Sequence, residues 1–166
     1  MEALEAENLV SEAIGEFLRR DGELLVAGAH ERTLCQRIAH QIQLKTSHHV
    51  DCDYDLVELA DGKKLNFDPV RLQQLGLTRH GPVQPDIVVH IRGDINSSFV
   101  VIEAKYSDRR ENEKEFDRYK LSLYQSQLNY RHAFQLIFYR GPHDARVQMI
   151  RVLPNEELMS VFESNV

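Results

Sequence analysis

The sequence holds few of the residues that mark several common classes of protein. It has only two cysteines, Cys35 and Cys52, and they form no CxxC pair, so a structural zinc site is not expected. We interpret both thiols as small buried hydrophobic groups. Eight glycines leave little room for a loop that cradles a nucleotide, and no P-loop, GxGxxG or GxSxG motif occurs. No apolar run approaches the roughly 18 residues of a membrane span.

A basic segment followed by an apolar one, as in a secretory signal, is also missing from the first ten residues, MEALEAENLV. We therefore expect a cytoplasmic protein without a membrane partner. The net charge is −6 at pH 7, and the whole acidic excess falls within residues 1–31. The remaining residues are balanced in charge. This distribution excludes a strongly basic protein that coats DNA, but it permits a nucleic-acid partner.

The length of 166 residues predicts one domain spanning residues 1–166. Within it we expect an N-terminal helical extension over 1–28, a core over 29–153 and a C-terminal tail over 154–166. Apolar periodicity predicts helices over 3–19, 29–45, 70–75, 111–131 and 156–163, and strands over 49–59, 133–140 and 145–153. Asp21-Gly22 is expected to end the first helix. Together with a central hairpin, this order favours an α/β sandwich, a mixed sheet between helices.

The stretch from Gln84 to Lys105, QPDIVVHIRGDINSSFVVIEAK, carries the clearest pattern. Two β-branched runs flank a polar turn, which predicts a β-hairpin. Centring the turn between Asp94 and Ile95 places Asp86 opposite Glu103, with Cβ atoms roughly 5 Å apart. Lys105 follows Glu103 by two positions and therefore points to the same face.

Charged side chains in this hairpin are costly unless they pair or hold a metal ion, because both faces of its strands are otherwise apolar. One interpretation is a buried ion pair between carboxylate and lysine. The other is a magnesium site, since Mg²⁺ takes one or two carboxylates and completes its shell with other oxygens. Asp86 and Glu103 are suitable ligands, and the carbonyl of Ala104 is a candidate third. Lys105 would then orient or deprotonate a water molecule, or stabilise phosphate charge.

Pro85-Asp86 followed by Glu103-Ala104-Lys105 resembles the signature of the PD-(D/E)xK nuclease superfamily, the restriction-endonuclease-like proteins. Within it, the chain is similar to small stand-alone members. The similarity extends to Glu31 with its helix, to Cys52-Asp53-Tyr54-Asp55 and to Asp117-x-x-Lys120-Leu121-x-x-Tyr124. The resemblance implies an αβββαβ fold with a central mixed sheet flanked by helices, here with an extra N-terminal helix. It also implies a divalent-metal-dependent nuclease that hydrolyses phosphodiester bonds, in DNA above all, using Mg²⁺ or Mn²⁺.

The resemblance also implies roles for particular residues. Asp86 and Glu103 would be metal ligands and Lys105 the catalytic lysine. Glu31 would complete the site, directly or through water, although a Glu in the first turn of a helix also complements the helix dipole. Lys120 would contact phosphate.

Three further interpretations stay open. His90 shares a face with Asp86 and is best interpreted as a buried or supporting histidine rather than a ligand. The fold alone does not fix a function, so a catalytically inactive module that binds a protein or nucleic acid is the alternative, such as a phage or host-defence accessory factor. A small nuclease that reaches both strands of a duplex would call for a homodimer, with helix 3–19 as the candidate interface.

Overall fold

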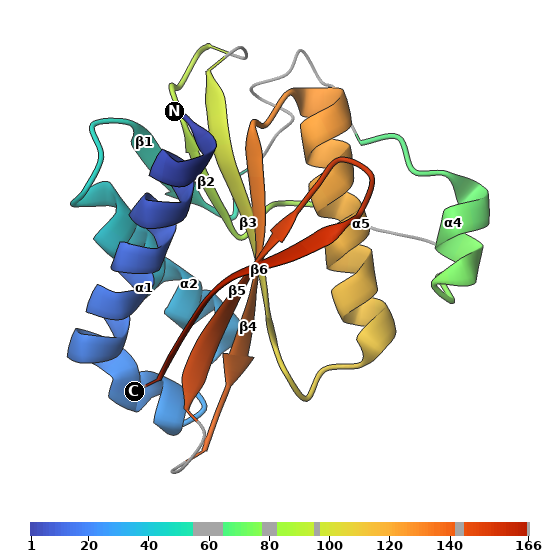
Figure 1. Ribbon diagram of the computed structural model, residues 1–166. Coiled ribbons are helices and arrows are strands. Elements are labelled where there is room, and N and C mark those ends of the chain that lie inside the picture. The colour runs from blue at the N-terminus through green and yellow to red at the C-terminus, as the bar shows by residue number, and fades with distance from the viewer. Residues whose placement is uncertain (55–64, 78–82, 95–96, 142–144, 166) are drawn as a thin grey trace.

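A single six-stranded sheet organises the molecule (Figure 1). The computed structural model describes residues 1–54, 65–77, 83–94, 97–141 and 145–165. The strands follow one another in the order of the chain: β1 His49–Cys52, β2 Ile87–His90, β3 Ser98–Tyr106, β4 His132–Tyr139, β5 Arg146–Val152 and β6 Leu158–Asn165. Neighbouring strands are antiparallel except β3 and β4, which are parallel. The expected mixed sheet is therefore confirmed.

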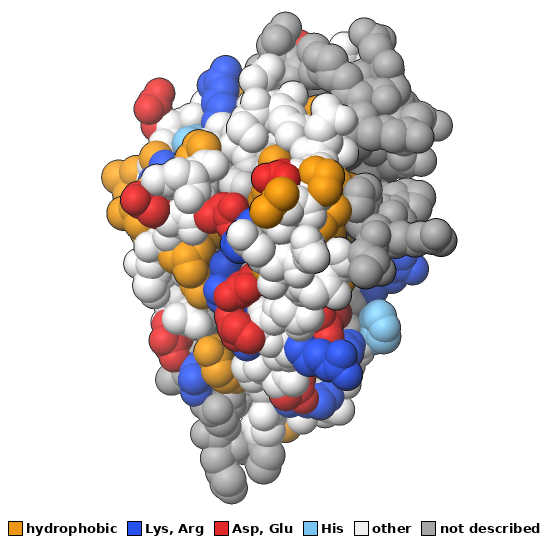
Figure 2. Space-filling model, turned by 90° about the vertical axis from the view of Figure 1, so that its right-hand side faces the viewer, with side chains coloured by type: hydrophobic (Ala, Val, Ile, Leu, Met, Phe, Trp, Pro, Cys, Tyr) orange, Lys and Arg blue, Asp and Glu red, His pale blue; other side chains and the backbone are white. Residues whose placement is uncertain are grey.

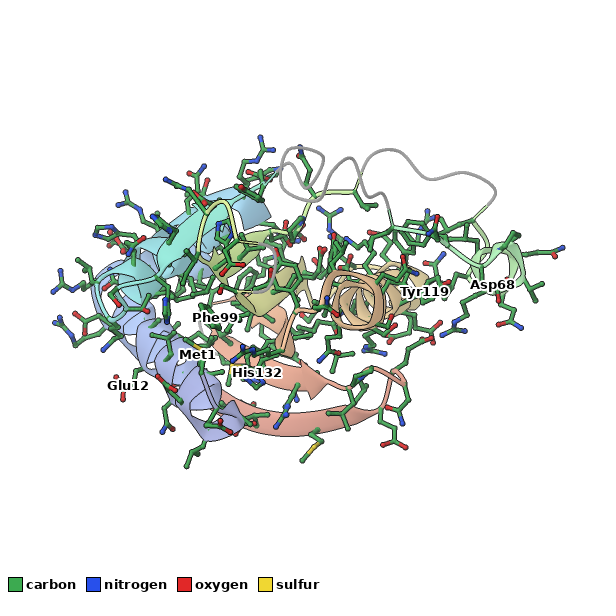
Figure 3. All side chains as sticks on the ribbon, turned by 90° about the horizontal axis from the view of Figure 1, so that it is seen from above. Met1, Glu12, Asp68, Phe99, Tyr119 and His132 are labelled. Atoms are coloured by element: carbon green, nitrogen blue, oxygen red, sulfur yellow. The ribbon has the colours of Figure 1, made fainter. Side chains whose placement is uncertain are left out.

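Helices cover both faces of the sheet. On one face lie α1 (Ala3–Val26) and α2 (Glu31–Gln43), and on the other lies α5 (Glu111–Leu128). The short α4 (Pro69–Gln74) lies outside α5, where the Tyr119 hydroxyl accepts a hydrogen bond from the amide of Asp68 at 2.8 Å (Figure 3). The α/β class with helices around a central sheet is thus confirmed. No helix among the described residues is long and apolar enough to cross a bilayer.

The side chains of β3 alternate between the two hydrophobic cores on either side of the sheet, because successive strand residues point to opposite faces. Val100, Ile102 and Ala104 belong to the core beneath α1 and α2. Val101 belongs to a second core beneath α5. Glu103 and Lys105 have the parity of Val101, so they face α5 as the hairpin pattern predicted.

The first helix is longer than expected. Asp21-Gly22 does not end it, and α1 continues to Val26. Gly22 and Leu25 are both buried and prolong the apolar stripe, so packing outweighs the roughly 1 kcal/mol that a helical glycine costs. The expected strand 49–59 is observed over 49–52, and its residues 55–59 lie outside the described part of the chain.

The expected C-terminal helix over 156–163 is wrong, because these residues contribute to β6. Leu153 and Glu157 close a tight turn through a backbone hydrogen bond of 2.9 Å, and β6 then pairs antiparallel with β5. The open edge of β5 offers backbone partners that a short helix lacks, so tertiary pairing overrides local propensity. Residues 158–165, predicted as a tail, therefore form an edge strand of the sheet.

The apolar stripe of α1 packs within the chain itself. It contacts α2 and the β4–β6 end of the sheet, and its largest residue, Phe17, is fully buried. The stripe is therefore buried within the chain, and a homodimer through helix 3–19 remains a prediction. The N-terminal helix is part of the core rather than an appendage.

We expect Phe17→Ala to lower the free energy of unfolding by about 3–5 kcal/mol, because it removes a buried aromatic ring and leaves a cavity. Urea denaturation followed by circular dichroism measures this change. Leu4→Ala on the same helix is the control, since Leu4 is 68% exposed and should change stability by about 0.5 kcal/mol or less. A Phe17→Ala effect as small as that of the control would contradict the packing of α1.

Candidate functional site at the end of the β2–β3 ladder

The pairing of β2 with β3 matches the register expected from the sequence. Ile87 pairs with Ile102 and Val88 with Val101, and extending the ladder by one residue brings Asp86 opposite Glu103. A bulge at Val89/His90 shifts the pairing only toward the turn. Asp86 itself precedes the first residue of β2.

Pro85 limits the ladder at this point. One more step would bring Pro85 opposite Ala104, and proline has no amide hydrogen to donate to the Ala104 carbonyl. The amide of Ala104 needs an acceptor, and it donates to the Asp86 carboxylate, with 2.7 Å between N and Oδ2. A side-chain oxygen thus takes the place of a strand carbonyl as acceptor, and this contact fixes one oxygen of the first candidate ligand.

Glu31 performs a similar role farther along β3. The amide of Tyr106 donates to Glu31 Oε1 at 3.1 Å, and Arg109 Nε donates to the same oxygen at 3.1 Å. Glu31 is the first residue of α2, so it reaches this edge from the helical layer opposite α5. Two predicted site carboxylates therefore accept hydrogen bonds from successive outward-facing amides of β3.

Four charged side chains form a network between β3 and α5. Lys120 Nζ lies 2.7 Å from Glu103 Oε2 and 2.9 Å from Asp117 Oδ1. Lys105 Nζ lies 3.4 Å from Asp117 Oδ2. Glu103, Asp117 and Lys120 are all buried, so Lys120 needs an acidic partner, and each acid needs a lysine whenever it is ionised.

Two carboxylate oxygens of this network lack a well-aligned donor. Among the described residues, Glu103 Oε1 and Asp117 Oδ2 are buried without a hydrogen-bond partner, although Lys105 lies 3.4 Å from the Asp117 oxygen and the Tyr124 hydroxyl interacts with Glu103. A buried acceptor left unsatisfied costs roughly 1–3 kcal/mol, and such groups in native proteins often belong to a functional site. The Glu103 oxygen is a position that a proton or a cation would satisfy.

Burial raises the pKa of Glu103 from 4.5 to about 8, and the charges of Asp86 and Asp117 add to this effect while Lys120 opposes it. Burial also raises the pKa of Asp86 above its usual range, against the hydrogen bond from Ala104. For Lys105, burial opposes the charged form, but the carboxylates of Asp117, Asp86 and Glu103 together raise its pKa. Lys105 is therefore a protonated ammonium, which suits stabilisation of negative charge better than removal of a proton from water.

Asp117 is a member of the network that was not counted among the predicted site residues. The signal was the pair Asp117 and Lys120, three apart on one helical face beside Leu121 and Tyr124, which are buried. Lys120, predicted to touch phosphate, is only 7% exposed and is held by the two carboxylates. Contact between Lys120 and a phosphate remains a prediction.

His90 forms a separate buried pair on β2. Its Nε2 lies 2.8 Å from Asp51 Oδ2, and Arg92 binds the same carboxylate. The ring of Tyr54 packs edge-on against it, with centroids 4.7 Å apart. These contacts agree with the interpretation of His90 as a buried, paired histidine.

The cysteines form no disulfide in the structure. Burial raises the pKa of Cys52 to about 11 and that of Cys35 well above its usual range. Both thiols therefore stay protonated and unreactive near neutral pH.

The donors of the site suit Mg²⁺ in type. Mg²⁺ typically takes one or two carboxylates and fills the remaining positions with water or substrate oxygens. Asp86 and Glu103, with its unpartnered oxygen, provide two carboxylates, and the Ala104 carbonyl is adjacent in sequence. Within the described residues, no three side chains of Asp, Glu, His or Cys are arranged as a complete metal site. Any metal would therefore depend on ligands beyond the protein side chains, as Mg²⁺ commonly does.

Comparison of the chain with family models, with curated proteins and with solved structures yields no match in any of the three.

We expect the stability of the wild-type protein to fall as pH rises from about 4.5 to about 8 through Glu103. In this range the unfolded chain has released the Glu103 proton and the folded chain retains it, so stability decreases with pH. Glu103→Gln cannot titrate and should show a shallower decrease. Urea denaturation at several pH values measures both slopes. Glu23→Gln, which removes an exposed carboxylate of α1, should keep the wild-type slope, and an unchanged slope in Glu103→Gln would contradict the assignment.

Proposed function

We propose that the protein is a divalent-metal-dependent nuclease that hydrolyses phosphodiester bonds, most of all in DNA. The observation that carries this proposal is the pair Asp86 and Glu103 at the end of an interrupted ladder. Asp86 is fixed by an amide at 2.7 Å, and Glu103 has a buried oxygen without a hydrogen-bond partner among the described residues. Lys105 follows on the same face and carries a positive charge. Two carboxylates beside a lysine are the groups that metal-assisted phosphodiester hydrolysis needs.

The arrangement of the elements supports a restriction-endonuclease-like fold. The segments α2, β1, β2, β3, α5 and β4 occur in the order αβββαβ, with β3 and β4 parallel on either side of the α5 crossover. Relative to that core, α1, β5 and β6 are additions, and α4 is inserted between β1 and β2. The fold family is part of the proposal, and it rests on this order together with the position of the carboxylates.

Mg²⁺ or Mn²⁺ would be held by Asp86 and Glu103 with the Ala104 carbonyl, and Glu31 would complete the site through a water molecule, since no three acidic side chains of the described residues are arranged around one metal position. When bound, such an ion supplies a Lewis acid for the phosphate and a water molecule of lowered pKa.

The protein's own residues would hold the reacting groups in place. The Ala104 amide orients Asp86, and the Tyr106 amide orients Glu31. Lys105, held at 3.4 Å from Asp117, would stabilise negative charge on the phosphate. Lys120 shares its charge between Glu103 and Asp117 and keeps both carboxylates compensated until substrate arrives.

We expect the purified protein to cleave plasmid, single-stranded or branched DNA in the presence of Mg²⁺ or Mn²⁺. Lys105→Ala should lower the cleavage rate by about 10²-fold or more, because it removes a positive charge from the reacting phosphate. Gel assays on a panel of DNA and RNA forms, with and without the metal ion, measure this rate. Lys45→Ala is the control, since Lys45 pairs with Glu12 on α1. Cleavage that survives both Lys105→Ala and Glu103→Ala would exclude the assigned site.

We expect Glu31→Gln to lower metal-dependent cleavage without unfolding the domain. The glutamine carbonyl still accepts from the Tyr106 amide, but it no longer carries the charge that would attract a metal ion. Parallel measurements of the cleavage rate and the melting temperature separate these effects. A cleavage rate equal to that of the wild type would indicate that Glu31 has a purely structural role.

The alternative is a catalytically inactive module of this fold that binds a protein or nucleic acid. The ion pairs of Lys120 with Glu103 and Asp117 favour it, because they compensate the carboxylates without a metal ion. Mixed acidic and basic side chains on the described part of the face in Figure 2 do not distinguish the two functions. Calorimetric titration with Mn²⁺ does distinguish them. Binding that disappears in Glu103→Gln supports the nuclease, and no binding supports the inactive module.

A further inference from the structure

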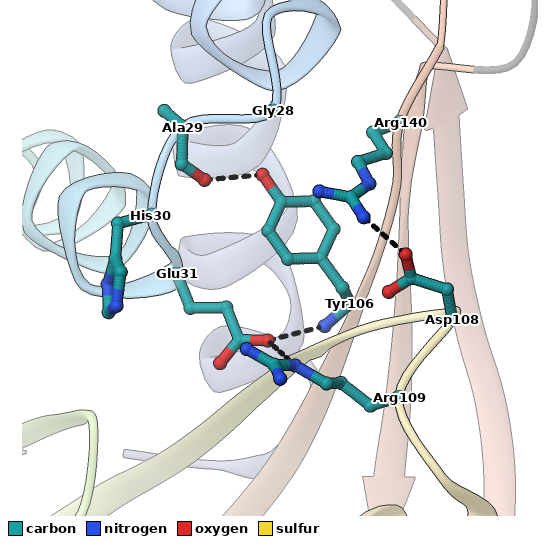
Figure 4. Close-up of a pocket in the computed structure, with 8 residues that line it drawn as sticks. All are labelled: Gly28, Ala29, His30, Glu31, Tyr106, Asp108, Arg109 and Arg140. Atoms are coloured by element: carbon teal, nitrogen blue, oxygen red, sulfur yellow. Dashed lines mark hydrogen bonds and ion pairs between the residues drawn. The ribbon is translucent and has the colours of Figure 1, made fainter.

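A polar cavity lies beside the proposed site, past the end of β3 (Figure 4). Its volume is about 330 Å³, which is within the range of small-ligand sites. The loop before α2, the residues that follow β3 and the residue that follows β4 form its walls. The lining residues are Gly28, Ala29, His30, Glu31, Tyr106, Asp108, Arg109 and Arg140.

Two arginines provide the binding groups of this cavity. Arg109 Nε donates to Glu31, and Arg140 Nη2 donates to Asp108. A guanidinium has five N–H donors in a planar fork, so each arginine keeps further donors beyond these contacts. Both side chains are about half exposed, at 50% and 49%, so an anion entering from solvent can reach them.

The position of Arg140 is held by its surroundings. Its guanidinium lies 4.9 Å from the centre of the Tyr106 ring, a favourable cation–π arrangement. Gly28 also lines the cavity, and a Cβ built there would be in ordinary contact with Arg140 Nη1 at 3.5 Å. Its φ of +71° is a backbone conformation that favours glycine.

The two ion pairs differ in how easily an anion can replace them. The Glu31 carboxylate is 16% exposed and also accepts from the Tyr106 amide, so it is fixed. The Asp108 carboxylate is 52% exposed, and exposed ion pairs contribute little stability. Asp108 can therefore rotate into solvent and leave Arg140 to bind another anion.

We propose that this cavity binds a phosphate group of a nucleic-acid strand through Arg140 and Arg109. The arginine fork matches phosphate geometry. Glu31 forms a wall of the cavity and also belongs to the proposed site, so the strand would pass from one to the other. This inference rests on the proposed nuclease function, and it names a contact that would position the substrate. The phosphate is either the terminal group of a strand or an internal diester.

The test is fluorescence anisotropy with two single-stranded oligonucleotides, labelled at the 3′ end and carrying either a 5′-phosphate or a 5′-hydroxyl. EDTA prevents metal-dependent cleavage during the titration. Arg140→Gln should weaken binding about tenfold, because it removes a charge-assisted hydrogen bond. Loss confined to the 5′-phosphorylated strand identifies a terminal phosphate, and equal loss for both strands identifies a diester.

Two further variants make the result specific. Asp108→Asn should tighten binding, because it removes the carboxylate that competes for Arg140. Arg131→Gln should leave binding unchanged, because Arg131 precedes β4 whereas Arg140 follows it, roughly 30 Å away at 3.3 Å per strand residue. Arg140→Gln and Asp108→Asn that both bind like Arg131→Gln would overturn the proposal.

The two proposals fail in different ways. DNA cleavage by a wild-type protein whose binding does not depend on Arg140 would exclude the phosphate cavity and leave the nuclease. Binding that depends on Arg140 without any metal-dependent cleavage would exclude the nuclease and leave the cavity. If neither oligonucleotide binds, calorimetric titration with inorganic phosphate decides, and heat that is absent in Arg140→Gln supports the cavity. No heat with the wild type overturns it.

Discussion

The two amides of β3 that extend past β2 need acceptors, and the rest of the site depends on how this need is met. Strand β2 begins at Ile87, and Pro85 has no amide hydrogen with which to form a further two-bond ladder pair. Carboxylates from Asp86 and Glu31 accept from the two amides, at 2.7 Å and 3.1 Å. An ordinary requirement of sheet structure, that buried amides be paired, thus gathers two acids from different layers along one strand edge.

On the other face of β3, acids and lysines compensate one another beneath α5. Glu103 and Asp117 are both buried. Each of these carboxyl groups therefore requires Lys120 or Lys105 nearby when it is ionised. Removing one lysine would leave a carboxylate uncompensated. The network therefore couples the position of α5 to the charge state of β3.

The hairpin could be predicted in detail because its signals are local. Period-two alternation assigned the faces of β2 and β3, and the assumed turn gave the register that is observed from Ile87 to Val89 but not at His90, where a bulge shifts the pairing. Contacts over long sequence separations could not be predicted in this way. Nothing near Glu31 reveals a hydrogen bond with an amide 75 positions away, and nothing in residues 158–165 outweighs a helical interpretation until the edge of β5 is known. The contact of Lys120 with Glu103 requires the crossover geometry of α5.

The two ends of the sheet differ in how far along the chain their partners lie. Strands β4, β5 and β6 follow one another through short connections, so their pairing closes small loops and loses little chain entropy. Asp86 and Glu103 meet within one hairpin, but the contact of Glu31 with the Tyr106 amide spans 75 positions. We infer that Glu31 joins the hairpin carboxylates late in folding, since non-local contacts form slowly. A partly folded chain would retain the β4–β6 meander and the hairpin and lack the complete site.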